Sequence, residues 1–101
     1  MFIIEQTNIF VKWFKSLKDP LAKISILKRI ERAEMGNFGD YKSVGNGIYE
    51  MRITTGAGYR VYYAQKGDVI YLLLNGGNKS TQQADIEKAK LIWEEVKGEM
   101  K

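Results

Sequence analysis

The chain has 101 residues and a hydrophobic content of 45%, enough for one domain with one modest core. It contains neither cysteine nor histidine, which excludes disulfides, metal sites built on thiolate or imidazole ligands, and every mechanism that uses imidazole as a base. The formal net charge of +4 favours a polyanionic partner but does not establish one.

The positive charge is concentrated in the middle of the chain. Residues 1–40 carry 7 basic and 5 acidic side chains (+2), residues 41–80 carry 5 and 2 (+3), and residues 81–101 carry 4 and 5 (−1). The N-terminus has no basic leader, and the longest apolar run, Val69 to Leu74, is far shorter than the roughly 18 residues that suggest a membrane span. We therefore expect a cytoplasmic protein without a membrane segment.

Two helices are predicted at the start of the chain. From Thr7 to Leu17, apolar residues recur at spacings of three and four, which is typical of an amphipathic helix with Thr7 as its N-cap. Asp19 and Pro20 then provide an N-cap and a proline at the first helical position, and the second helix continues to about Met35. Its apolar residues recur at steps of three: Leu21, Ile24, Leu27 and Ile30.

Glycines between residues 36 and 47 break the helical pattern, so this segment is expected to be a loop in which Tyr41 and Lys42 are exposed or half-exposed. Three segments rich in β-branched and aromatic residues follow, separated by turns that contain glycine: Ile48–Thr54, Tyr59–Ala64 and Val69–Leu74. They predict a three-stranded antiparallel meander.

Residues 75–80 are expected to be a loop, and the spacing of apolar residues predicts a last helix from about Ser80 or Gln83 to Lys97. Two N-terminal helices, the three-stranded meander and a C-terminal helix make one α+β domain over residues 1–101. The helices should cover one face of the sheet, because a lone meander cannot bury its apolar side.

The register of the first hairpin decides which side chains share a face. If a three-residue loop separates Thr54 from Gly58, one face is apolar and the other holds Arg52 opposite Arg60. The apolar face then contains three pairs: Ile53 with Tyr59, Met51 with Val61, and Tyr49 with Tyr63. A two-residue loop would mix the faces, which sequences avoid when one face is buried.

Two like charges directly opposite each other cost about 0.2–1 kcal/mol, so Arg52 and Arg60 need an explanation. Glu50 lies on the same face and can neutralise the pair as a surface charge cluster. Alternatively, a polyanion bridges both guanidiniums, since their planar forks match phosphate oxygens. Both interpretations remain open at this point. Tyr62 is placed by the same parity on the arginine face, where it could stack on a base.

Four segments carry a family resemblance: Ile48–Ile53, Gly58–Tyr63, Leu72–Ser80 and Gln82–Ala89. In this order, and without a large insertion, they resemble the HigB-like addiction-module killer proteins of the RelE/ParE toxin superfamily. The resemblance implies helices on one side of a small sheet and basic residues on the other side or at its edge. It also implies inhibition of translation by ribosome-dependent mRNA cleavage, without a cofactor or metal, and neutralisation by a helix-turn-helix antitoxin.

Position by position, the resemblance implies catalytic roles for Arg52, Arg60 and Lys79. It gives RNA-binding roles to a second set: Tyr62, Asn75, Gln82 and Lys42. The implied chemistry is attack of an RNA 2′-hydroxyl on the adjacent phosphate, which needs a base, an acid and stabilisation of the charged phosphorane.

The proton-transfer groups are where the chain departs from its relatives. The relatives often supply a histidine or a C-terminal tyrosine for proton transfer, whereas this chain has no histidine and no tyrosine after Tyr71. Lys79 can transfer a proton only if neighbouring arginines depress its pKa. Two alternatives therefore remain: a ParE-type toxin that inhibits DNA gyrase by protein contact, and an inactive member that binds an antitoxin.

Overall fold

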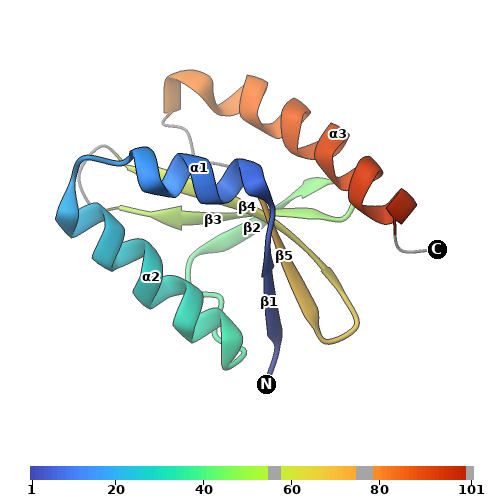
Figure 1. Cartoon of the computed structure of the whole chain (residues 1–101), viewed down its shortest axis with the longest axis horizontal. Helices are drawn as coiled ribbons and strands as arrows, with labels where there is room; N and C mark the ends of the chain where they lie inside the picture. The colour runs from blue at the N-terminus through green and yellow to red at the C-terminus, as the bar shows by residue number, and fades with distance from the viewer. Residues whose placement is uncertain (55–57, 75–78, 100–101) are drawn as a thin grey trace.

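The computed structural model describes residues 1–54, 58–74 and 79–99, which form a mixed α+β fold (Figure 1). In chain order the elements are β1 (Ile3–Gln6), α1 (Asn8–Ser16), α2 (Pro20–Glu34), β2 (Tyr41–Gly45), β3 (Ile48–Ile53), β4 (Tyr59–Lys66), β5 (Val69–Leu74), the 3-10 turn η1 (Lys79–Thr81) and α3 (Gln82–Glu99). The predicted meander is present as β3, β4 and β5, and it forms the centre of a larger sheet.

The sheet has five strands in the order β1-β5-β4-β3-β2, so sequence reasoning missed both edge strands. β1 pairs in parallel with β5, and the other neighbours are antiparallel. β1 has only four residues and no alternation of apolar and polar side chains, which removes the usual strand signal. The loop predicted over β2 is wrong, because its glycines mark a bulge and a tight turn. Tyr41 and Lys42 are exposed, as predicted.

Helices cover both faces of the sheet, which corrects the expectation of a single covered face. α1 and α2 pack on one face, where a core cluster contains Phe10, Ile26, Met51 and Val61. α3 packs on the other face, through a second cluster that contains Ile48, Tyr62, Ala64, Ala89 and Trp93. The sheet face that carries Arg52 and Arg60 is therefore partly covered by α3, and only the uncovered part is accessible to solvent.

The predicted N-caps of both N-terminal helices are confirmed. The Thr7 hydroxyl accepts a hydrogen bond from the Phe10 amide at 3.2 Å. Asp19 Oδ1 accepts from the Leu21 amide at 3.0 Å and the Ala22 amide at 3.3 Å, with Pro20 at the first helical position. These contacts satisfy amide groups that lack a partner within the helix.

The apolar face predicted for α2 is largely wrong. Its buried residues recur at steps of four, four and three: Ala22, Ile26, Ile30 and Ala33. Of the four residues used for the prediction, only Ile30 is buried; Leu21, Ile24 and Leu27 are exposed. Steps of exactly three residues drift around a helix that has 3.6 residues per turn, so such a series cannot stay on one face.

The predicted register of β3 and β4 is confirmed. Met51 lies opposite Val61, and Arg52 lies opposite Arg60. Met51 and Val61 are both fully buried beneath α1 and α2, so the two arginines project from the other face. The loop that was predicted to set this register, residues 55–57, lies outside the described residues.

Arg29 of α2 ties the start of β2 to the end of β3. Its guanidinium donates hydrogen bonds to the carbonyl of Phe38 at 3.0 Å, to that of Asp40 at 3.2 Å, and to that of Arg52. Burial lowers the pKa of Arg29, and the charge of Arg32 acts in the same direction while Asp40 opposes both. The contact with the Arg52 carbonyl fixes the backbone from which one arginine of the site projects.

Gly39→Ala should weaken this connection. Gly39 has a φ of +62°, and a Cβ atom there would lie 2.7 Å from Arg29 Nη2. We expect the free energy of unfolding to fall by about 2–4 kcal/mol, from backbone strain and from disturbed charged hydrogen bonds. Gly67→Ala is the matched control: its φ is +58° and nothing lies within 4 Å, so strain alone should cost about 1–2 kcal/mol. Equal losses in urea unfolding would show that Arg29 is not disturbed.

Candidate functional site

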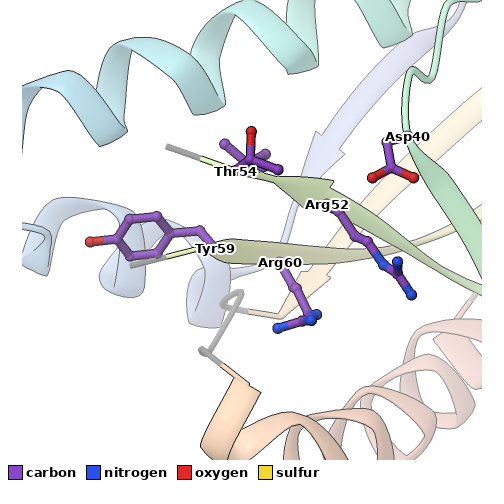
Figure 2. Close-up of a pocket in the computed structure, with 7 residues that line it drawn as sticks. Asp40, Arg52, Thr54, Tyr59 and Arg60 are labelled. Carbon is purple, nitrogen blue, oxygen red and sulfur yellow. The ribbon is translucent and has the colours of Figure 1, made fainter. Parts of the chain in front are cut away.

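Arg52 and Arg60 line a cavity of about 220 Å³ at the end of β3 and the start of β4 (Figure 2). Its lining comes from the two strands, from the residues directly after β3 and before β4, and from the residue before β2: Asp40, Arg52, Ile53, Thr54, Gly58, Tyr59 and Arg60. The Arg52 side chain is 38% exposed and that of Arg60 is 11% exposed. Two guanidiniums therefore lie together at one partly enclosed surface.

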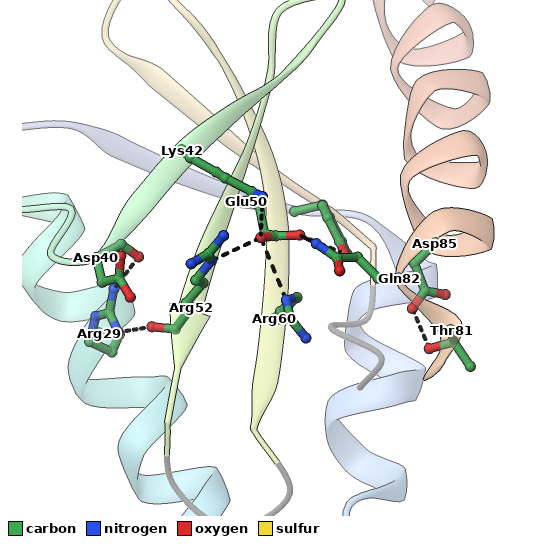
Figure 3. A network of polar contacts seen from close by, with 10 residues as sticks. Arg29, Asp40, Lys42, Glu50, Arg52, Arg60, Thr81, Gln82 and Asp85 are labelled. Atoms are coloured by element: carbon green, nitrogen blue, oxygen red, sulfur yellow. Dashed lines mark hydrogen bonds and ion pairs between the residues drawn. The ribbon is translucent and has the colours of Figure 1, made fainter. Parts of the chain in front are cut away.

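Glu50 is the centre of the polar network behind this cavity (Figure 3). Its side chain has no exposed surface. Its Oε1 atom lies 3.2 Å from Arg52 Nε, 3.5 Å from Arg60 Nε and 4.0 Å from Lys42 Nζ. The carboxylate thus contacts cations from three neighbouring strands, β2, β3 and β4.

The other carboxylate oxygen of Glu50 connects the network to α3. Oε2 accepts hydrogen bonds from Tyr62 Oη at 3.1 Å and from Gln82 Nε2 at 2.8 Å. Gln82 is the first residue of α3, so this bond fixes the start of the helix over the sheet. Glu50 consequently links the arginine pair to the element that covers the rest of the face.

The geometry bears on both explanations of the arginine pair. Glu50 does neutralise part of the charge, but it is buried rather than part of a surface cluster. Three cations, Arg52, Arg60 and Lys42, surround this one buried carboxylate. The exposed carboxylate of Asp40 also borders the cavity, and the group still keeps a formal positive charge. Arg60 Nε is buried and makes no hydrogen bond within the described part of the chain, only the 3.5 Å ion pair. Neutralisation is therefore incomplete, and the site keeps an attraction for anions.

The ionised form of Glu50 is favoured in the fold. Burial alone would raise the pKa of Glu50, but hydrogen bonds from Gln82, Arg52 and Tyr62 and the charge of Lys42 outweigh it and lower that pKa. Because the folded pKa lies below the unfolded one, Glu50 contributes stability that is fully present above about pH 4.5 and is lost as the pH falls through the folded pKa.

Glu50→Gln provides the measurement of this pH dependence. The glutamine cannot ionise, so wild type should be more stable than the variant at pH 7, and the two urea midpoints should converge as the pH falls from about 4.5 towards 3. A difference that stayed constant over this range would mean that Glu50 is not the titrating group.

Tyr62 lies on the arginine face, as parity predicts, but it is fully buried against α3. This burial corrects the expectation that Tyr62 lies outside the core, because its ring has no exposed surface in this conformation on which an RNA base could stack. Burial, together with the neighbouring Glu50 carboxylate, raises the pKa of Tyr62 well above its ordinary value of 10.0. Tyr62 is therefore a neutral donor to Glu50 and not a base.

Two of the remaining predicted residues belong to the network around Glu50, and the side chains of the other two lie outside the described residues. Lys42 reaches Glu50 with a side chain that is 47% exposed, and Gln82 uses its amide on Glu50. Lys79 begins η1, but its side chain, like all of Asn75, lies outside the described residues. The structure thus brings five of the predicted residues to one carboxylate: Arg52, Arg60, Tyr62, Gln82 and Lys42.

Sequence reasoning missed Asp40 as a site residue. It lies in the segment that was predicted to be a loop, and its exposed side chain lines the arginine cavity (Figure 2). It reaches this position because the Arg52 amide donates to the Asp40 carbonyl at 2.9 Å. Since this contact depends on β2 pairing with β3, no local signal in the sequence could have placed Asp40 beside Arg52.

Comparison with known proteins places the chain in a family. The family described as "Phage derived protein Gp49-like (DUF891)" matches residues 12–97. The chain belongs to the Gp49-like family. A relative in Haemophilus influenzae, an uncharacterized protein, is 50% identical over 93 residues, which cover 92% of this chain and 94% of the relative. No solved structure matches this Gp49-like protein.

The described residues of this Gp49-like protein contain neither a metal-binding group of acidic side chains nor a membrane-spanning helix. Among residues 1–54, 58–74 and 79–99, no group of three or more acidic side chains is arranged to hold a metal ion. Within the same ranges, no helix is long and apolar enough to cross a membrane.

Proposed function

We propose that this Gp49-like protein is the toxin of a type II toxin–antitoxin pair, and that it inhibits translation by ribosome-dependent cleavage of mRNA in the cytoplasm. The observation that carries the proposal is the pair Arg52 and Arg60. The two residues lie opposite each other on β3 and β4, and both line one cavity. Their positive charge is only partly neutralised by Glu50. The strand segments that resemble HigB-like killer proteins support the same function.

In this proposal the two arginines bind the scissile phosphate and stabilise the phosphorane. Each approaches Glu50 through Nε, so the terminal nitrogens of each guanidinium can face a phosphate oxygen. A planar fork offers two parallel hydrogen bonds, which a point charge cannot. Because Glu50 holds both side chains before substrate arrives, little reorganisation is needed as negative charge develops.

The proposed reaction is transesterification within the RNA. The 2′ oxygen forms a bond to phosphorus, the bond from phosphorus to the 5′ oxygen breaks, and the products carry a 2′,3′-cyclic phosphate and a 5′-hydroxyl. Asp40 is proposed to take the proton from the 2′-hydroxyl, since its carboxylate lines the same cavity as both arginines. Lys79, to which the family resemblance gives a catalytic role, is proposed as the donor to the leaving oxygen.

Asp40→Asn should lower the cleavage rate about a hundredfold, at the lower end of the usual contribution of a general base. The amide keeps the shape of the side chain and leaves the backbone contact with Arg52 in place, so binding of uncleavable RNA should not weaken. Asp68→Asn, in the exposed turn between β4 and β5, is the control for removal of one carboxylate. Unchanged cleavage by Asp40→Asn would assign proton abstraction to another group.

The proposed partner is a helix-turn-helix antitoxin, and α2 offers a surface for it. Leu21, Ile24 and Leu27 are large apolar residues that are exposed on this helix, and a protein partner that covered them would remove apolar surface from water. An antitoxin segment that buries them would follow a common mode of peptide recognition, a helix or an extended strand laid on an apolar surface.

Expression in cells tests the function as a whole. Brief expression of the protein should stop growth and produce new mRNA ends within coding sequences, and co-expression of the small gene next to it should restore growth. Growth arrest without new mRNA ends would instead favour a gyrase inhibitor of the ParE type. Normal growth at a confirmed protein level would favour an inactive member of the family.

A further inference from the structure

A second basic pocket lies beside the arginine cavity, on the α2 side of β3. Its volume is about 290 Å³. The lining comes from four residues of α2, the last residue of β3 and the residue that follows it: Ser25, Lys28, Arg29, Arg32, Ile53 and Thr54. Three of the four α2 residues are cationic, and the acidic residues of that helix, Glu31 and Glu34, are not part of the lining.

The two basic pockets adjoin each other. Ile53 and Thr54 line both. The pairing of β2 with β3 ends at Tyr41 and Met51, which leaves the end of β3 without a β2 neighbour. Figure 2 shows Thr54 at this end, with a helix on one side of the strand and Arg52 and Arg60 on the other. A chain that leaves the arginine cavity can therefore cross the end of β3 and reach α2.

The cations of the second pocket differ in the hydrogen bonds and ion pairs that they make within the protein. Arg29 donates to three backbone carbonyls and serves the fold. Lys28 and Arg32 are exposed, and within the part of the chain that is described neither has a carboxylate within 4.0 Å. Arg32 also lies close enough to Arg29 to lower its pKa by repulsion. Asp40 offsets part of the charge of Arg29, so Lys28 and Arg32 are the cations that make this pocket an attractive site for an anion.

We infer that this pocket binds a second phosphate of the same single-stranded RNA, on one side of the scissile phosphate, with Lys28 and Arg32 as its ligands. The inference rests on the proposed function, because it takes the arginine cavity as the place of the scissile phosphate. It adds a substrate subsite: the RNA crosses the end of β3, and the contact on α2 is to the backbone and independent of base sequence.

The test measures binding of uncleavable 2′-O-methyl RNA at several salt concentrations, with a 12-nucleotide strand and with a trinucleotide. The variant Lys28→Ala/Arg32→Ala removes the two exposed cations. Lys12→Ala/Lys15→Ala removes the same charge from exposed positions of α1 that line neither pocket. Melting temperatures of both variants verify that they are folded.

For the 12-nucleotide strand, the slope of log K against log salt should become less steep by about 1.4 in Lys28→Ala/Arg32→Ala, since each phosphate contact with a single strand contributes about 0.7. The slope of Lys12→Ala/Lys15→Ala should equal that of wild type, and trinucleotide binding should be unchanged in both variants. Equal slopes for both variants on the 12-nucleotide strand would overturn the subsite, as would equal losses on both RNA lengths.

The same experiment separates the subsite from the proposed function. If Arg52→Ala weakens binding of the trinucleotide while Lys28→Ala/Arg32→Ala changes nothing, the arginine site stands and the subsite is wrong. If wild type binds neither RNA at any salt concentration, the subsite is rejected, whereas the ribosome-dependent function is decided separately by the cleavage of mRNA on programmed ribosomes.

Discussion

Arg52→Ala is expected to lower the rate of mRNA cleavage about a hundred- to thousandfold, because removal of one preorganised donor to a developing oxyanion typically costs this much. The fold should be retained, since the Arg52 side chain is 38% exposed and its contact to Glu50 is one of several. In cells the variant should no longer arrest growth. Growth assays, with the melting temperature recorded on the purified protein, measure the two effects separately.

Arg60→Ala should reduce cleavage to the same degree but with some loss of stability. Arg60 was predicted to lie outside the core, yet its side chain is 11% exposed and borders the carboxylate of Glu50.

Lysine at either position should restore cleavage only in part, because an ammonium group lacks the planar fork. Lys66→Ala, on an exposed position of β4, is the control. Full growth arrest by folded Arg52→Ala would remove the arginine from the mechanism.

Glu50→Ala is expected to have the largest effect on stability of any single substitution in the site. Loss of the carboxylate leaves the cations of the network without their common partner and the Tyr62 hydroxyl without its acceptor. Removing one member of a buried ion pair typically costs about 3–5 kcal/mol, and we expect about 3 because Lys42 and Arg52 are partly exposed. This corresponds to a fall of roughly 12–24 °C in Tm.

Glu31→Ala is the matched control for this substitution, since it removes an exposed glutamate of α2. It should change the free energy of unfolding by no more than about 0.5 kcal/mol. Urea unfolding of both variants gives the comparison. If Glu50→Ala unfolded at the same urea concentration as Glu31→Ala, the network around Glu50 would contribute nothing to stability.

The sequence allowed the centre of this site to be predicted because strand alternation is local and strict. Placing Arg52 opposite Arg60 required only that apolar residues share a face, and the structure confirms the pairing. The same alternation put Glu50 and Tyr62 beside the arginines. It could not predict their burial, since that depends on α3, which packs on this face from the end of the chain.

Other features depended on contacts between distant segments. β1 is held by pairing with β5, some 66 residues further along the chain, and its own four residues carry too little pattern to be recognised. β2 pairs with β3 through a bulge, where glycines indicate a loop when read alone. Asp40 joined the site only through that pairing. The exposed leucines of α2 were predicted to lie on its buried face, because apolar residues were assumed to face the core.

Cleavage of mRNA on programmed ribosomes tests the central claim most directly. Purified wild type, Arg52→Ala and Lys66→Ala are incubated with ribosomes that carry a defined mRNA, and the 5′ and 3′ ends of the products are mapped. The proposed function predicts cut mRNA with 2′,3′-cyclic phosphate and 5′-hydroxyl ends from wild type and Lys66→Ala, and about a hundred- to thousandfold slower cleavage by Arg52→Ala. Intact mRNA with wild type, from a preparation that arrests growth in cells, would contradict it.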